Sequence, residues 1–203
     1  VHFRGLTKRR PHNNVLLALE SVYSMDGTIC ALPDLIKVLE RHAPHRNTRH
    51  ILVDEAHGAG VYGQGGRGVC NALHCHVSAR LVTFGKAFGC AGAVLLVPVL
   101  WREYLLNYAR PLIYSTALPP SQAAAIDVVI SAWERGEMEA AVQMLHTRVA
   151  ELYTALGLRS DAALPPAPIV QVRSAHAKRL AAPVHAAGLL VRAVGMRLWR
   201  RHL

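Results

Sequence analysis

Short hydrophobic runs alternate with stretches of helical periodicity along the first half of the chain. Four of these runs are four or five residues long and are bounded by polar residues, glycine or proline. Runs of this length and boundary are typical of buried β-strands. The pattern therefore predicts strands at residues 15–19, 50–53, 81–84 and 93–97.

Residues 32–42, between the first two runs, have the period of an amphipathic helix. Pro33 stands at the beginning of this segment, where a helix tolerates proline. The apolar face consists of Leu32, Leu35, Ile36 and Leu39. Strands that alternate with helices indicate an α/β fold with a largely parallel sheet, covered on both faces.

Beyond Pro119 and Pro120 the chain becomes alanine-rich and helical in period. The pattern predicts helices at 122–133, 136–156 and 175–187, and short strands at 169–172 and 189–191. We therefore expect a partial large domain over residues 1–133. A connecting helix and part of a smaller α/β domain are expected over residues 134–203.

Polar groups follow three of the predicted strands, at 20–26, 54–57 and 83–86. In open α/β sheets the functional groups gather at the carboxyl ends of the strands. Because the carboxyl ends of parallel strands meet at one edge of a sheet, we expect these three segments to face one crevice.

The most informative group is the amine of Lys86, with the carboxylate of Asp54 and the imidazole of His57. Pyridoxal 5'-phosphate (PLP) needs a lysine for its Schiff base, an anion at its pyridine nitrogen and a hydrogen bond to its phenolic oxygen. Gly85 and Gly89 flank the lysine and permit close approach of a ligand. A solvated lysine beside a capped turn is the alternative interpretation.

Five sequence motifs occur in one order along the chain. They are Glu-Ser-Val-Tyr-Ser-Met-Asp-Gly at 20–27, Val-Asp-Glu-Ala-His-Gly-Ala-Gly-Val-Tyr-Gly at 53–63, Gly-Arg-Gly at 66–68, Thr-Phe-Gly-Lys-Ala-Phe-Gly at 83–89 and Ile-Tyr-Ser-Thr-Ala-Leu-Pro-Pro at 113–120. This set resembles the α-oxoamine synthases, which are PLP enzymes with the fold of aspartate aminotransferase. They join an amino acid to an acyl thioester with loss of carbon dioxide.

The resemblance implies a role for each matching residue. Lys86 would form the Schiff base with PLP and later move protons at the α-carbon of the amino acid. Asp54 would pair with the pyridinium nitrogen. Ser24 and His57 would bind the phenolic oxygen, and Thr83 the phosphate.

The resemblance also implies partners. Ser115 and Thr116 would reach the cofactor phosphate of a second subunit, since the family works as homodimers. The branch that joins L-alanine to a pimeloyl thioester, bound to coenzyme A or to a carrier protein, in biotin biosynthesis is the most similar. Branches that use glycine or serine remain open as alternatives.

Both ends of the chain depart from the family pattern. Nothing before Val15 corresponds to the glycine-rich segment and ring-stacking histidine of the family. Residues 195–203 replace the expected run that leads to the arginine for the substrate carboxylate, which should lie beyond the chain end. We therefore expect this chain alone to bind PLP weakly and to lack condensation activity. A truncated, non-catalytic family member is the alternative.

The net charge of +10 raises the question of a nucleic-acid partner. Seven basic residues in the first ten and last seven positions account for most of it, so solvated ends explain the charge and no nucleic acid is expected. The run Asp54–His57 also matches a helicase magnesium motif. A helicase needs an upstream phosphate-binding loop that this sequence lacks.

The four cysteines lack the Cys-x-x-Cys spacing of a structural zinc site. Residues 74–76 (His-Cys-His) offer ligand types, but adjacent side chains rarely converge on one ion, so no metal is expected. No apolar run approaches the roughly 20 residues that span a bilayer. Free thiols favour a reducing compartment. The cytoplasm is expected, with mitochondria and peroxisomes left open.

Overall fold

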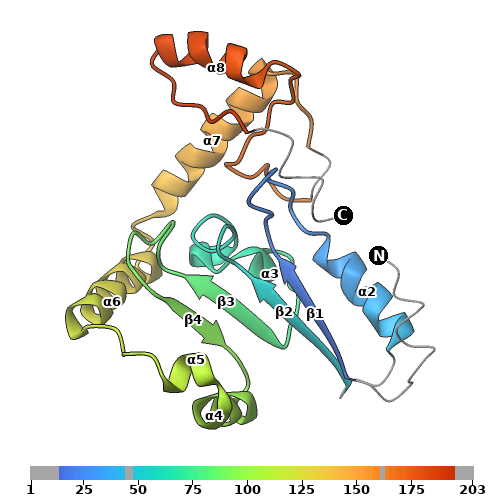
Figure 1. Ribbon diagram of the computed structural model, residues 1–203, viewed down its shortest axis with the longest axis vertical. Coiled ribbons are helices and arrows are strands. Elements are labelled where there is room, and N and C mark those ends of the chain that lie inside the picture. The colour runs from blue at the N-terminus through green and yellow to red at the C-terminus, as the bar shows by residue number, and fades with distance from the viewer. Residues whose placement is uncertain (1–13, 44–47, 161–162, 195–203) are drawn as a thin grey trace. The chain divides into compact units, whose positions relative to one another are not determined.

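The computed structural model describes residues 14–43, 48–160 and 163–194 of the 203-residue chain. The chain forms two compact units, with the boundary between Val170 and Gln171. Figure 1 shows the helices and strands in chain order. The first unit contains a four-stranded sheet, whose strands are β1 (Val15–Glu20), β2 (Arg49–Asp54), β3 (Ala79–Thr83) and β4 (Ala93–Leu96). All four strands lie where the hydrophobic runs predict them.

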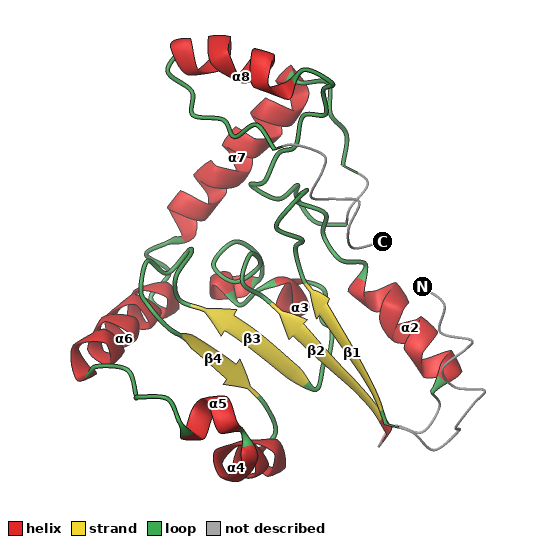
Figure 2. Ribbon diagram, viewed as in Figure 1, coloured by secondary structure: helices red, strands yellow, loops and turns green. Residues whose placement is uncertain are grey.

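The strand order is β1-β2-β3-β4 (Figure 2). The first three strands are parallel and β4 is antiparallel to β3. The predicted α/β fold with a largely parallel sheet is confirmed. Parallel pairing places the carboxyl ends of β1, β2 and β3 at the same edge.

Helices connect and follow the strands. In the first unit they are α2 (Leu32–His42), η2 (Gln64–Gly66), α3 (Val69–Ala72), α4 (Val99–Tyr108), α5 (Arg110–Ile113), α6 (Pro120–Glu134) and α7 (Glu139–Ala155); the second unit contains α8 (Ala177–Ala186). The helices predicted from periodicity correspond to α2, α6, α7 and α8. Among the described residues, no helix is long and apolar enough to cross a bilayer.

Two predicted strands are wrong. Residues 169–172 and 189–191 form neither strand nor bridge in the structure. A strand needs a neighbour to receive its backbone hydrogen bonds. In the part of the chain that the structure describes, no strand pairs with either segment, so their apolar sequence does not produce a strand.

The main core lies between the sheet and α2. Leu32 and Leu39, on the predicted apolar face of the helix, are almost completely buried, as are Val22 of the first loop and Val53 of the central strand β2. Fully burying side chains of this size contributes about 1.5–3 kcal/mol each. This packing holds β1 and β2 in register and so fixes the positions of the residues that follow them.

A second cluster of buried side chains anchors the turn after β3. Phe84 and Phe88 are each 8% exposed and pack with Ala59 and with Trp133 of α6. The Phe88 and Trp133 rings lie 5.6 Å apart. Both phenylalanines flank Lys86, so the cluster fixes the backbone that carries the lysine.

Candidate functional site

The three polar segments predicted to share one edge do lie at the carboxyl ends of neighbouring strands. Glu20, the last residue of β1, is the register partner of Asp54, the last residue of β2. Asp54 is in turn the partner of Leu81 in β3, two residues before Thr83 at the end of that strand. The sheet therefore carries two carboxylates and a hydroxyl along one edge.

Lys86 and His57 meet at this edge. The Nζ atom of Lys86 lies 2.9 Å from Nε2 of His57, although 29 residues separate them in sequence. An ammonium group can only donate, so His57 accepts through Nε2 and its own proton must be on Nδ1. Lys86 is exposed and His57 is half-buried. The imidazole of His57 therefore orients an amine that is exposed to solvent.

The pKa of His57 is lowered from its ordinary value of 6.5. Burial of the ring is the largest cause, because a charged imidazole loses hydration there, and the Lys86 ammonium adds to it. The carboxylates of Glu20 and Asp54 act in the opposite direction. His57 is therefore neutral near pH 7 and able to accept the hydrogen bond from Lys86.

We expect His57 to titrate below pH 6.5 in the folded chain, as measured by NMR of its ring proton, with the resonance identified by its loss in His57→Gln. Since the unfolded chain binds this proton more readily, stability should fall as pH drops from 6.5 toward the lowered pKa. A titration midpoint at or above 6.5 would contradict the burial of the His57 ring and its contact with the Lys86 ammonium.

Asp54 is held rigidly by its own turn. Its Oδ1 atom accepts a hydrogen bond from the backbone N–H of Ala56 at 2.8 Å, and its carbonyl accepts one from the N–H of Ser21 at 2.8 Å. A carboxylate that bonds the backbone two residues on stabilises the turn after a strand. The side chain is therefore fixed at the sheet edge, on the same strand end as His57.

Thr83 and Ser24 are placed differently. The hydroxyl of Thr83 donates to the carbonyl of Gly92 and accepts from the N–H of Gly85, both at 3.3 Å, so it supports the lysine turn. Ser24 is exposed on the turn after β1, and its backbone N–H donates to Oε2 of Glu20 at 3.3 Å. Both lie near strand ends, as predicted, without a direct bond to Lys86 among the described residues.

Ser115 and Thr116 are not brought into this group. Both are exposed on the segment between α5 and α6, and the Ser115 hydroxyl donates to the carbonyl of Pro111. Among the described residues, neither forms a hydrogen bond with Lys86, His57 or Asp54. Their expected role toward a second subunit stays a prediction.

Glu55 is a residue whose importance the sequence patterns did not reveal. Its side chain is fully buried, and its two oxygens accept hydrogen bonds from the N–H groups of Val69 at 3.0 Å and Cys70 at 2.7 Å. A Cβ at Gly68 would lie 2.6 Å from the Glu55 carboxyl carbon, so only glycine fits there. These two bonds join the end of the loop that follows His57, at Val69 and Cys70, to its beginning at Glu55. The alternation of a strand, which sends Asp54 outward and Glu55 inward, could have indicated it.

The loop that follows His57 packs closely on the lysine turn. Gly60 has a φ of +77°, and a Cβ there would lie 2.4 Å from the Cβ of Ala87. We expect Gly60→Ala to destabilise the chain by about 1–3 kcal/mol through overpacking, in addition to about 1–2 kcal/mol for the left-handed backbone. Urea unfolding measures the change.

Gly65→Ala provides the matched control. Its φ is +57°, yet nothing lies within 4 Å of the added Cβ, so only the backbone cost applies. Equal losses of stability in the two variants would show that Gly60 and Ala87 do not pack as described.

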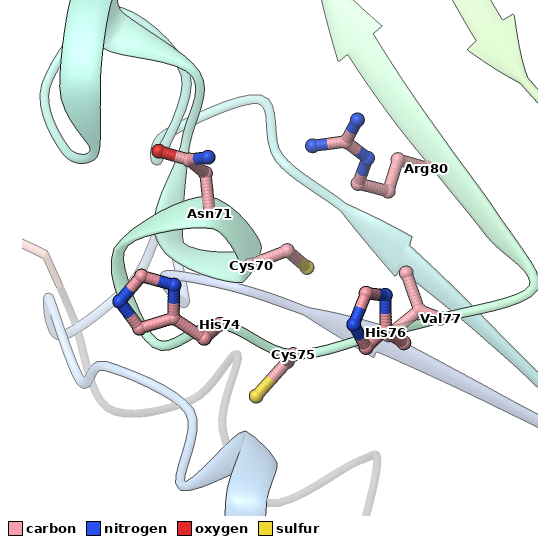
Figure 3. A pocket seen from close by; sticks show the side chains of 7 residues that line it. All are labelled: Cys70, Asn71, His74, Cys75, His76, Val77 and Arg80. Carbon is pink, nitrogen blue, oxygen red and sulfur yellow. The ribbon is translucent and has the colours of Figure 1, made fainter.

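A pocket of about 320 Å³ contains the His-Cys-His run (Figure 3). In Figure 3 the side chains of Cys70 and Cys75 point in different directions, and His74 and His76 lie on either side of Cys75. Among the described residues, no three His, Cys, Asp or Glu side chains are grouped so that they could hold a metal ion. This pocket lies at the end of β3 opposite Thr83.

Comparison with known sequences adds independent information. The model of the aminotransferase class I and II family matches residues 2–196. The chain is 42% identical over 140 residues to 8-amino-7-oxononanoate synthase from Yersinia pestis (strain Pestoides F), covering 69% of this chain and 35% of that protein. It is 45% identical over 122 residues to 8-amino-7-oxononanoate synthase from Erwinia tasmaniensis, covering 60% and 30%. The chain thus spans about a third of the length of these relatives.

Solved structures give a consistent result. The 8-amino-7-oxononanoate synthase from Francisella tularensis matches with a TM-score of 0.69 and 28% identity, over 93% of this chain and 56% of that one. A serine palmitoyltransferase variant from S. paucimobilis with bound PLP and myriocin matches with a TM-score of 0.75 and 26% identity, over 94% and 50%.

Proposed function

Because this chain belongs to the aminotransferase class I and II family and has the fold of PLP-dependent transferases, we propose that it acts as a PLP-dependent acyltransferase of the α-oxoamine synthase type. It would join L-alanine to a pimeloyl thioester and release carbon dioxide, as in biotin biosynthesis. The 2.9 Å contact between Lys86 and His57 at the carboxyl edge of the sheet carries the proposal. The similarity to the 8-amino-7-oxononanoate synthases from Y. pestis and E. tasmaniensis supports the reaction.

The chemistry of the residues at this edge supports PLP as the proposed cofactor. Apart from chain neighbours, no described atom lies within 4 Å of a Cβ added at Gly89, so this side of the Lys86 turn has open space. Lys86 would hold the aldehyde, Asp54 the ring nitrogen, and Ser24 with His57 the phenolic oxygen. Asp54 uses only one carboxylate oxygen for its own turn among the described residues. Thr83 would contribute to holding the phosphate.

Bound PLP would supply an electron sink for the negative charge that develops at the α-carbon of the amino acid. Asp54 would keep that sink effective, because its carboxylate favours a protonated ring nitrogen. Lys86, once its amine is free, would remove and return a proton at the α-carbon. His57, which is neutral near pH 7, would orient the amine and accept its hydrogen bond. One lysine would therefore serve both in holding the cofactor and in moving the proton.

A second candidate is an α-oxoamine synthase that uses serine or glycine. The structural similarity to serine palmitoyltransferases favours it. Its chemistry at Lys86, Asp54 and His57 would be the same, and only the amino acid and the acyl chain would differ.

Exposed apolar side chains support a protein partner for this chain. Val99, Leu100, Tyr104 and Tyr114 are all more than 60% exposed, and they lie on the same stretch of chain as Ser115. Large exposed apolar side chains that cluster in this way are typical of a protein interface. We propose a homodimer whose interface includes α4 and α5. The four free cysteines support the cytoplasm as the proposed compartment.

The proposed function is tested by incubating the longest reading frame that contains this chain with PLP, an amino acid and an acyl thioester, because the 203 residues alone are expected to bind PLP weakly and to lack condensation activity. L-Alanine with pimeloyl-coenzyme A should release carbon dioxide and free thiol, whereas serine with palmitoyl-coenzyme A should not. Release with serine and palmitoyl-coenzyme A alone would favour the second candidate. PLP uptake without release in any combination would indicate a non-catalytic member, and no uptake at all would contradict the proposal.

A further inference from the structure

Glu20 lies at the carboxyl edge of the sheet, at the end of the outer strand β1, but has no role in the assignments above. It is the last residue of β1 and the register partner of Asp54, so both carboxylates leave the sheet side by side. Its side chain is only partly exposed. A second carboxylate beside Asp54 is costly unless it has partners, because like charges at neighbouring strand positions repel.

One partner of Glu20 is the turn that carries Ser24. Oε2 of Glu20 accepts a hydrogen bond from the backbone N–H of Ser24 at 3.3 Å. The same turn is closed by the N–H of Gly27, which donates to the carbonyl of Tyr23 at 2.9 Å, and by the carboxylate of Asp26, which accepts from the N–H of Thr28 at 2.9 Å. Glu20 is therefore one of the contacts that tie this turn to the end of β1, beside the N–H of Cys30, which donates to the carbonyl of Ser21 at 2.9 Å.

Glu20 also contributes negative charge to the surroundings of His57. His57 is faced by Lys86 from the turn after β3, by Asp54 from the end of β2 and by Glu20 from the end of β1. Lys86 lowers the pKa of His57, and the two carboxylates raise it, Glu20 more strongly than Asp54. Without Glu20, one ammonium would face a single carboxylate, which is also committed to its own turn.

We propose that Glu20 is a positioning residue of this site, which holds the Ser24 turn against the sheet and supplies the negative charge that balances Lys86 at His57. The functional meaning of this role rests on the proposed function. The two physical roles of Glu20 do not, because both are properties of the chain without cofactor.

Two conservative variants separate the two roles. Glu20→Gln keeps an oxygen that can accept from the Ser24 N–H but removes the charge. Glu20→Asp keeps the charge but shortens the reach to Ser24. Glu40→Gln is the control, since Glu40 is an exposed carboxylate on α2 that pairs with Arg49 at 3.0 Å.

The readouts are the NMR titration of His57 and the hydrogen exchange of the Ser24 amide, both in the full 203-residue chain without PLP. Glu20→Gln should lower the pKa of His57 below that of the unsubstituted chain and leave Ser24 exchange unchanged. Glu20→Asp should leave the His57 titration in place and speed Ser24 exchange by roughly 2–10-fold, as expected for loss of one hydrogen bond. Glu40→Gln should change neither.

An unchanged His57 titration in Glu20→Gln would overturn the electrostatic role. Unchanged Ser24 exchange in Glu20→Asp would overturn the positioning role. If one variant fails to fold, the other still decides its own role. A chain that passes both tests but takes up no PLP would refute the proposed function and leave this inference standing.

Discussion

Replacing Lys86 with alanine should lower the exchange of the amino acid's α-proton by about 10²–10⁴-fold, the usual contribution of a positioned general base. The loss should be large because the same amine would both hold PLP and move the proton. It should not arise from unfolding, since Lys86 is exposed and its turn is anchored by Phe84 and Phe88. Deuterium exchange from solvent into L-alanine, followed by NMR in the longest reading frame that contains this chain, measures the rate.

Lys37→Ala is the matched control for this variant. Lys37 is an exposed lysine on α2 whose Nζ lies 3.5 Å from Asp34, in an ion pair of the kind that contributes little to stability. The control should exchange at the unsubstituted rate. Equal rates in Lys86→Ala and Lys37→Ala would remove Lys86 from the mechanism.

Asp54→Asn should weaken PLP binding by roughly 5–15-fold, because it replaces a charge-assisted hydrogen bond, worth about 1.5–3 kcal/mol, by a neutral one, worth about 0.5–1.5 kcal/mol. Proton exchange should fall as well, since a neutral amide does not favour the protonated ring nitrogen. The fold should persist, because the Asn side-chain oxygen can still accept from the Ala56 N–H. Titration of the visible absorption of PLP measures the affinity.

Asp34→Asn serves as the control for Asp54→Asn, because Asp34 is an exposed carboxylate in the first turn of α2. It should leave PLP affinity unchanged. Normal affinity and normal proton exchange in Asp54→Asn would assign Asp54 some other task, such as closure of the turn to Ala56.

The strands and α2 could be predicted from sequence because their hydrophobic residues are confined to one face or one short run. Leu32 and Leu39 repeat with the helical period, and both are buried. By contrast, α4 has apolar side chains on all sides and no buried residue, so it gives no amphipathic signal. Periodicity reports which face is buried, and it therefore fails for a helix with no buried face.

The candidate site was predictable where polar residues follow strands. Lys86 and His57 were placed together because parallel strands bring their carboxyl ends to one edge, and the structure joins them at 2.9 Å. The buried carboxylate of Glu55 and the turn contact of Glu20 depend on loop geometry, which has no simple sequence period. The resemblance read from the five motifs is confirmed at the level of the family.

The central claim is that Lys86 is the lysine that takes up PLP. Incubation of the chain with PLP, reduction with borohydride and peptide mapping by mass spectrometry test it most directly, because reduction fixes even a weakly bound cofactor to its lysine. The label is predicted on the peptide that contains Lys86. A label on Lys8, Lys37 or Lys178 instead, or no label on any lysine, would contradict the claim.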